Sequence, residues 1–239
     1  MASRRTTHPS SSRSSSRTSS RPSSRSSSFV PSVGLLLWTL VAGAVLVVGA
    51  LHYEQPPQPS ADQAFPPLPG PAAHRTVPAA EPVVSPLPPA EPLRLRIPFI
   101  DVNVPLAKLH LNAAGALDPP PADDPRLAGW YSEGTTPGSV GTAVTAGHVD
   151  QRTGRPGVFF GLGVLTKGKV IEIDRVDRRT AVFTVEAVEV YDKAHFPSRM
   201  VYGSSGRADL RVITCGGGYS KATGYRGNVV VYATLVAVR

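Results

Sequence analysis

An uncharged run of eighteen residues divides this chain into parts that cannot share one fold. Residues 34–51 read GLLLWTLVAGAVLVVGAL, and Glu54 is the first charged residue after them. The run is close in length to the roughly 20 apolar residues that cross a bilayer as a helix. Trp38 and Tyr53 lie near its two ends, where amphipathic rings prefer the membrane interface. The sequence therefore predicts a transmembrane anchor over residues 34–53.

Basic residues on one side of this run predict its orientation. Six Arg residues and no acidic residue precede it, at positions 4, 5, 13, 17, 21 and 25. Positive charge stays on the cytoplasmic side, so we expect a single-pass protein of the cell membrane with a cytoplasmic N-terminus and the bulk of the chain outside the cell. A signal peptide cleaved near Val48-Gly49-Ala50 is the alternative. The length of the run and of the leader before it favours an uncleaved anchor.

Low-complexity sequence flanks the anchor on both sides. Residues 1–33 contain mainly Ser, Thr and Arg before the run begins, and they predict a disordered cytoplasmic tail. Residues 54–92 are rich in Pro and Ala, and Pro at this density favours an extended extracytoplasmic stalk or linker. Residues 93–239 remain, and their length suits one folded domain.

Charge and residue type exclude several classes of function. Of the formal net charge of +8, six charges belong to the tail, so the folded part is nearly balanced. A nucleic-acid-binding domain carries its basic patch on folded surface, and we therefore predict no nucleic-acid partner. A single Cys, Cys215, allows no intramolecular disulfide. Neither metal-ligand spacing nor a phosphate-binding glycine pattern is present, so no metal or cofactor is predicted.

Short apolar segments with strand-like alternation fill the remaining domain. Leu93, Leu95 and Ile97 alternate with Arg94 and Arg96, as in a half-buried strand. Expected strands cover residues 93–97, 102–106, 141–146, 170–173, 182–185, 188–191, 210–214 and 229–238. About eight short strands indicate a mostly β fold, a closed or nearly closed barrel. Helical turns are expected only near residues 124–127 and 158–165.

Two strand ends carry residues suited to chemistry. Thr145-Ala146-Gly147-His148 delivers a histidine where a buried strand meets a loop, and Leu210–Cys215 delivers a cysteine followed by three glycines. A strand fixes such a side chain while a loop opens it to substrate. Glycines clear space around the sulfur, and an imidazolium nearby promotes the thiolate that nucleophilic catalysis needs. Alone, each residue has a structural explanation; together they predict Cys215 as nucleophile and His148 as its partner.

The same segments resemble a known family. TAGH at Thr145–His148, LRVITC at Leu210–Cys215 and NVVVYA at Asn228–Ala233 are similar to sortases, from about Leu93 to the C-terminus. The runs TCGGG and YRGNVVVYA look most like the class E/F branch, class F in particular. The resemblance implies a seven- or eight-stranded sortase barrel and a His–Cys–Arg active site. The cysteine would attack a sorting-signal threonine carbonyl and form a thioacyl enzyme, which an amine of a cell-wall precursor or pilin resolves.

Two arginines compete for the third catalytic position. In many sortases this arginine lies on the last strand, where alignment of the closing segment places Asn228, with Arg226 two residues earlier on the same face. Positions 211, 213 and 215 also share one face of a strand, so Arg211 could extend towards Cys215. We place Arg211 first, because its facing follows from a clear strand pattern, and Arg226 second.

The sequence thus predicts a membrane-anchored cysteine transpeptidase that cleaves a C-terminal sorting signal of secreted proteins and transfers it to an amine. Two alternatives stay open. Another cell-wall cysteine enzyme, such as an L,D-transpeptidase, also uses Cys and His in a β-rich domain, although its usual Ser-His-Gly-Cys context is missing before Cys215. An inert surface-binding module would leave Cys215 merely packed.

Overall fold

A computed structural model of the chain describes residues 55–66, 84–121 and 124–239, all within the compact unit that spans Glu54–Arg239. The predicted tail (1–33) and anchor (34–53) lie outside the described residues, as does part of the predicted linker, 67–83. Within the described ranges, no helix is long and apolar enough to cross a membrane.

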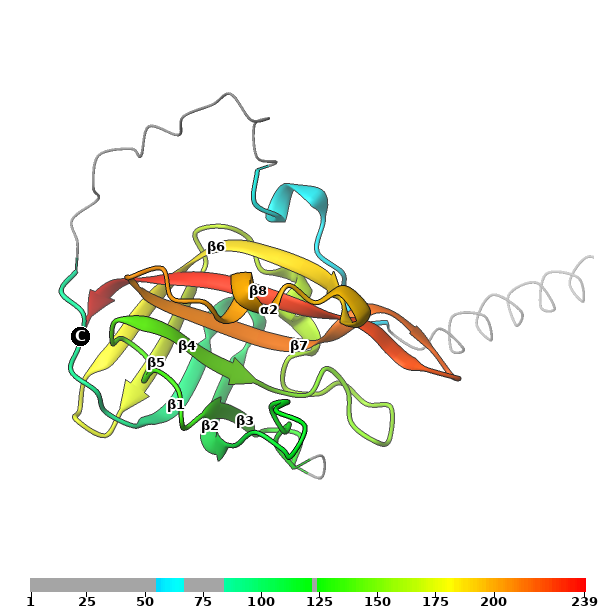
Figure 1. Ribbon diagram of the computed structural model, residues 1–239, viewed down its shortest axis with the longest axis horizontal. Coiled ribbons are helices and arrows are strands. Elements are labelled where there is room, and N and C mark those ends of the chain that lie inside the picture. Colours follow the sequence, from blue (N-terminus) through cyan, green and yellow to red (C-terminus); the bar gives the residue numbers. More distant parts are fainter. Residues whose placement is uncertain (1–54, 67–83, 122–123) are drawn as a thin grey trace, which may run out of the picture. The chain divides into compact units, whose positions relative to one another are not determined.

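Eight strands and a few short helices make up the described fold (Figure 1). The strands are β1 (Pro92–Ile97), β2 (Val102–Leu109), β3 (Ala128–Tyr131), β4 (Gly141–Ala146), β5 (Val170–Arg175), β6 (Thr180–Asp192), β7 (Ala208–Ser220) and β8 (Gly224–Val238). The 3-10 helices are η1 (Ala61–Gln63), η2 (Pro98–Ile100), η3 (Phe160–Val164) and η4 (Lys193–His195), and α2 (Ser198–Tyr202) is an α-helix.

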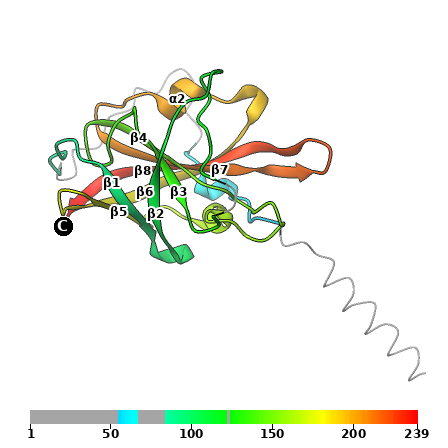
Figure 2. The same ribbon diagram turned by 90° about the horizontal axis from the view of Figure 1, so that it is seen from below.

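The strands close into a barrel in the order β1-β2-β3-β4-β7-β8-β6-β5. The pairs β2–β3 and β4–β7 are parallel and the remaining pairs are antiparallel. The β7–β8 hairpin projects from the end of the barrel opposite the C-terminus (Figures 1 and 2). The predicted mostly β fold and closed barrel are confirmed, with eight strands.

Several elements differ from their predicted bounds. The strands expected at 182–185 and 188–191 are one strand, β6, because a register shift between Val185 and Ala187 absorbs Glu186 without breaking the ladder. Strand β3 has only four residues, too few to show an alternation, and was not predicted. The expected helical turn at 158–165 is present as η3, whereas 124–127 forms a turn without a helix.

Alternate residues of each strand face either the barrel interior or its outer face. The interior core takes residues from every strand, among them Leu95, Leu210 and Val231, all fully buried. A second cluster, which we call the outer-face cluster, packs on the other side of β4, β6, β7 and β8. Its buried members are Val144, Ala187, Val201, Ile213, Val230 and Tyr232.

A buried arginine ties part of the predicted linker to the barrel. The Arg175 side chain is fully buried, and its guanidinium donates to the backbone carbonyls of Pro137 and Pro88. It also pairs with Asp177, 2.9 Å away, and this hydrogen bond lowers the pKa of the Asp177 carboxyl below its usual value. Leu87 enters the interior core one residue before Pro88. Arg175 therefore holds residues 84–91 against β5.

Replacement of Arg175 with Leu should lower the free energy of unfolding by about 3 kcal/mol, because buried carbonyls lose their donors. Urea denaturation measures this loss. Arg179→Ala is the matched control, since Arg179 is exposed and lies in the same β5–β6 turn; its change should stay within about 0.5 kcal/mol. Equal stability of the two variants would contradict the role assigned to Arg175.

Candidate active site

The parallel pairing of β4 with β7 brings the two predicted catalytic residues together. Ala146 is the register partner of Ile213, and His148 and Cys215 each lie two residues further along their segments. The pairing persists just beyond β4, because the Gly147 N–H donates to the Ile213 carbonyl at 3.2 Å. Neighbouring strands lie about 4.8 Å apart. His148 therefore stands beside Cys215 at the edge of the barrel.

Thr214 fixes the loop that carries the histidine. Its hydroxyl donates to the Gly147 carbonyl at 2.9 Å, and its side chain faces the opposite side of β7 from Cys215. Thr214 is buried, whereas Cys215 and His148 are both partly exposed. Gly147 and Thr214, the residues just before His148 and Cys215, thus join the two segments by hydrogen bonds. His148 and Cys215 themselves stay open to solvent.

The β2–β3 connection sets the tautomer of His148. The Nε2 atom of His148 lies 2.7 Å from the backbone carbonyl oxygen of Pro120. A carbonyl only accepts hydrogen bonds, so Nε2 must carry a proton. That leaves Nδ1 as the ring nitrogen that can take up and release a proton.

The glycines that follow Cys215 form a bulge in the β7–β8 ladder. Gly216 pairs with Gly227 and Tyr219 with Tyr225, so β7 carries one extra residue in this interval. Gly217 and Gly218 have φ values of 73° and 87°, a region that favours glycine. The β7 ladder therefore stays regular through Gly216, one residue beyond Cys215, and is interrupted after it.

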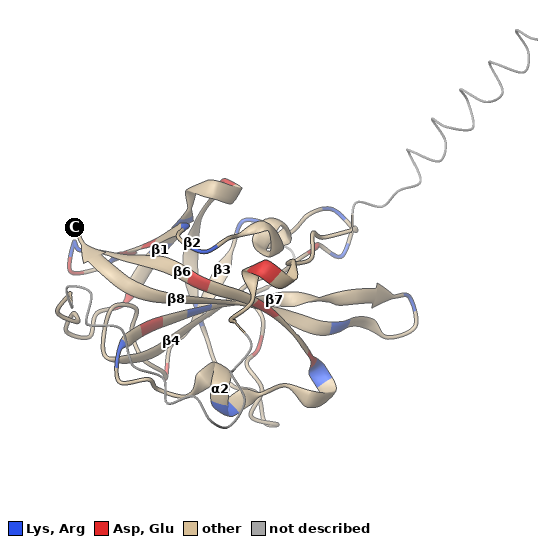
Figure 3. Ribbon diagram, turned by 90° about the horizontal axis from the view of Figure 1, so that it is seen from above, with Lys and Arg blue, Asp and Glu red and all other residues tan. Residues whose placement is uncertain are grey.

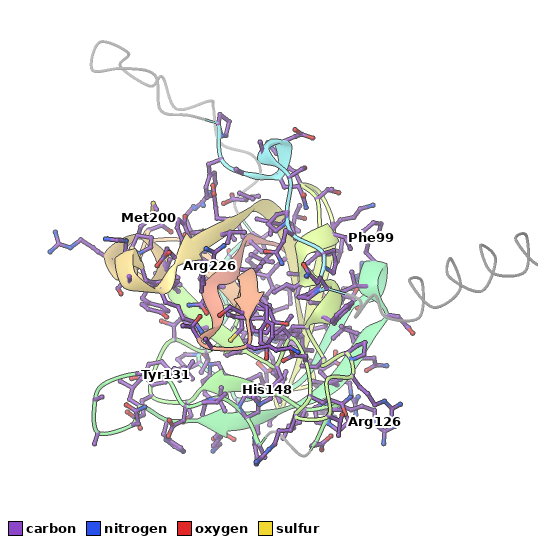
Figure 4. The ribbon with its side chains drawn as sticks, turned by 90° about the vertical axis from the view of Figure 1, so that its right-hand side faces the viewer. Phe99, Arg126, Tyr131, His148, Met200 and Arg226 are labelled. Carbon is purple, nitrogen blue, oxygen red and sulfur yellow. The ribbon has the colours of Figure 1, made fainter. Side chains whose placement is uncertain are left out.

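The two candidate arginines lie in different surroundings. Arg226 is exposed on β8, and its Nη2 atom would lie 3.0 Å from a Cβ at Gly218, so its guanidinium packs against the bulge. Figure 4, which views the hairpin end of the barrel, shows Arg226 and His148 at this same end. Cys215 pairs with Asn228, two residues after Arg226. Arg226 is thus close to the cysteine edge.

Arg211 is held away from that edge. Its guanidinium lies 4.3 Å from the ring centroid of Tyr232 and 3.6 Å from Asp209. Asp209 lies towards the start of β7 and Tyr232 is the partner of Arg211 directly across on β8, whereas Cys215 lies four residues along β7 in the direction away from Asp209. The residue is buried, and this burial lowers the pKa of its guanidinium against the opposing effect of Asp209. The structure does not bring Arg211 to Cys215.

Two polar side chains near the cysteine were not identified from the sequence. Lys193 in η4 places its Nζ atom 4.0 Å from Cys215 Sγ. Tyr225 on β8 donates its hydroxyl to Asp150 at 2.9 Å, which links the hairpin to the loop after His148. Burial, with Asp150 acting in the same direction, raises the pKa of Tyr225, so the hydroxyl keeps this proton. No local pattern could have found either residue, because both reach the site through tertiary contacts.

Asp150 follows His148 by two residues, and its hydrogen-bond partner is Tyr225 of the β7–β8 hairpin, whose hydroxyl donates to the Asp150 carboxylate. Among the described residues, no group of three or more His, Cys, Asp or Glu side chains is arranged to hold a metal ion. Acidic and basic residues are interspersed over the ribbon (Figure 3).

Comparison with models of protein families matches the sortase domain over residues 95–236, more than half of the chain. The chain belongs to the sortase family. Sortases are cysteine transpeptidases, and this sortase has Cys215 as its single cysteine. The predicted family is confirmed, and the alternative of a different cell-wall cysteine enzyme is set aside.

Solved sortase structures are similar to this chain. The SrtA sortase from Actinomyces oris is 18% identical, covering 68% of this chain and 89% of that chain with a TM-score of 0.47. Sortase A of Listeria monocytogenes is 20% identical, covering 63% and 89% with a TM-score of 0.45. A Clostridium perfringens sortase D5 transpeptidase is 18% identical, covering 62% and 79% with a TM-score of 0.46. A search of curated proteins found no significant match.

Replacement of Lys193 with Ala should slow alkylation of Cys215 by iodoacetamide about fivefold at neutral pH. An ammonium 4 Å from sulfur stabilises the reactive thiolate by about 1 kcal/mol in water. Lys193→Arg keeps the charge and should retain most of the rate. The matched control is Lys221→Ala, an exposed residue between β7 and β8. Equal rates for the Ala variants of Lys193 and Lys221 would refute a charge effect of Lys193.

Proposed function

We propose that Cys215 is the nucleophile of this sortase, that His148 is its acid/base partner and that Arg226 stabilises the oxyanion. The observation that carries the proposal is the β4–β7 register, which sets His148 beside Cys215. The packing of Arg226 on the bulge after Cys215 supports its choice over Arg211, whose guanidinium is engaged with Asp209 and Tyr232.

In the first half of the reaction, the Cys215 thiolate attacks a backbone carbonyl of the sorting signal. A carbon–sulfur bond forms, and negative charge develops on the carbonyl oxygen, which the Arg226 guanidinium stabilises. The carbon–nitrogen bond then breaks, and His148 Nδ1–H donates its proton to the departing amine. The product is a thioacyl enzyme with a neutral His148.

In the second half, an amine of a cell-wall precursor or a pilin attacks the thioacyl carbonyl. His148 Nδ1 removes a proton from this amine, the carbon–sulfur bond breaks and the thiolate returns. The bond between His148 Nε2–H and the Pro120 carbonyl keeps the ring oriented through both halves, because Nε2 never gives up its proton.

The sorting signal would bind along the outer face of β4 and β7. The outer-face cluster provides an apolar floor there, with Val144 and Ile213 in line with the His148 and Cys215 strand ends. Partly buried Leu117, Tyr131 and Phe196 pack on this floor from neighbouring connections. Phe196 belongs to the segment 194–197, which follows β6 and would line one side of the bound peptide.

The cellular setting of the reaction is also a proposal. Residues 34–53 would anchor the protein in the membrane, with residues 1–33 in the cytoplasm and the barrel outside the cell. The uncharged run and the Arg residues before it support this orientation. The TCGGG and YRGNVVVYA segments support membership of class E/F, class F in particular. Secreted proteins with a C-terminal sorting signal are the substrates proposed for it.

Replacement of Cys215 with Ala should reduce transpeptidation by at least about 10³-fold, and His148→Ala should reduce it by about 10²–10⁴-fold. The assay incubates the full-length protein with a pentapeptide library and several amines and detects peptide–amine products by mass spectrometry. Far-ultraviolet circular dichroism should be the same for both variants and the wild type. Transfer that persists in Cys215→Ala would refute the proposed nucleophile.

Arg226 and Arg211 should respond differently to replacement by Ala. Loss of an oxyanion donor costs about 10²–10³-fold in kcat, which is the expected result for Arg226→Ala with unchanged stability. Arg211→Ala leaves buried Asp209 with only the exposed Arg207, 3.5 Å away, as its cation, so the free energy of unfolding should fall by about 2 kcal/mol while kcat per folded molecule is retained. Kinetics and urea denaturation on both variants distinguish the two roles, and the reverse pattern would assign the oxyanion to Arg211.

A further inference from the structure

A segment outside the matched sortase domain reaches the active site of this sortase. Residues 55–66 precede the matched range, 95–236, and belong to the part predicted as linker. In Figure 1 they form the cyan segment that passes the end of β6 and continues into η1. The segment is attached to the barrel at several points, and one of them, Gly217, lies two residues after Cys215.

Two contacts fix the segment to η3. The buried side chain of Gln63 donates from Nε2 to the carbonyls of Gly163, at 2.9 Å, and Leu165. The carbonyl of Pro57 packs so closely on Gly163 that a Cβ at this glycine would lie 2.0 Å from it. The segment therefore follows a defined path along the barrel.

Gln58 connects this path to the bulge after the cysteine. Its Oε1 atom accepts from the Gly217 N–H at 2.9 Å, and its Nε2 atom donates to the Pro56 carbonyl at 2.9 Å. Only one orientation of the amide satisfies both partners, because an N–H needs an acceptor and a carbonyl needs a donor. Both ends of the Gln58 amide are thus used, and the side chain holds Gly217 in place.

The bulge needs such a support. Gly217 and Gly218 are the most permissive residues for backbone rotation, and the bulge interrupts the ladder that would otherwise restrain them. The Arg226 guanidinium rests against Gly218. A change at Gly217 therefore moves the surface on which Arg226 packs.

We propose that Gln58 is a positioning residue of the active site, which acts through the Gly217–Gly218 bulge on Arg226. This inference rests on the role proposed above for Arg226. Removal of the Gln58 acceptor leaves the Gly217 N–H without its partner, so the bulge can adopt several conformations. The Arg226 guanidinium that packs on the bulge then occupies several positions, and it stabilises the oxyanion less well. The segment 55–66 is then part of the catalytic unit, although no local sequence signal marks it.

The experiment uses full-length protein, a peptide selected from a pentapeptide library by the wild type, and hydroxylamine as the nucleophile that resolves the thioacyl enzyme. Gln58→Met keeps the length of the side chain and removes the acceptor, and it should lower kcat about fivefold with little change in KM, the effect of one lost hydrogen bond. Gln58→Glu keeps an acceptor and should restore most of kcat. Gln55→Ala, an exposed residue of the same segment, is the matched control and should behave as the wild type.

Two further measurements separate positioning from other roles. Hydrogen exchange of the Gly217 amide should become faster in Gln58→Met, while the midpoint of thermal unfolding stays within about 2 °C of the wild type. Unchanged kcat in Gln58→Met, or a higher kcat because the segment obstructs the site, would overturn the inference. Cys215→Ala is measured in parallel: transfer that survives in it rejects the proposed function itself, whereas loss in Cys215→Ala with a normal Gln58→Met rejects only the role of Gln58.

Discussion

The parallel pairing of β4 with β7 is the constraint on which the active site depends. It joins two segments that are far apart in the sequence, and its register decides which residue of one segment meets Cys215 of the other. Because side chains alternate along a strand, a slip of one residue would turn His148 to the other face. The buried core on the two faces of β7 fixes this register, since Val212 belongs to the interior and Ile213 to the outer-face cluster. Packing in the barrel is thus what aligns the proposed catalytic pair.

Around that pair, the site gathers groups from elements that end at the same edge of the barrel. Pro120 lies in the β2–β3 connection, Lys193 follows β6 and Arg226 lies on β8, while the cysteine belongs to β7. The Pro120 carbonyl accepts from His148, the Lys193 ammonium lies 4.0 Å from the Cys215 sulfur, and the Arg226 guanidinium packs on the bulge that follows the cysteine. The strands supply a rigid base, and the connections supply charges and hydrogen bonds. Such a division suits acyl transfer, which needs a fixed nucleophile and several donors aimed at one developing charge.

The sequence predicted the barrel, and it singled out the candidate pair Cys215 and His148, because both leave local signals. Alternation of apolar residues marked most strands, and the two strand ends carried recognisable runs, TAGH and LRVITC. The choice between Arg211 and Arg226 lacked such a signal. Strand periodicity assigned Arg211 and Cys215 to one face, but it does not say which way a long side chain extends. The Arg211 guanidinium pairs with buried Asp209, towards the start of β7, and lies over the ring of Tyr232, directly across on β8. The positions of Lys193 and Gln58 near the cysteine depend on tertiary contacts, which leave no local signal in the sequence.

The predicted linker shows how composition can describe a segment correctly and still miss its role. Proline at the density of residues 54–92 disfavours both helix and internal ladder positions, and residues 55–59 indeed have neither. A chain without secondary structure of its own keeps its backbone and side-chain amides available for other partners. Gln58 lies in this stretch and accepts from the bulge after Cys215, while Gln63, in the short helix η1 that follows, donates to η3. The lack of regular structure in residues 55–59 is therefore compatible with a defined position, because the barrel supplies hydrogen-bond partners such as the Gly217 N–H.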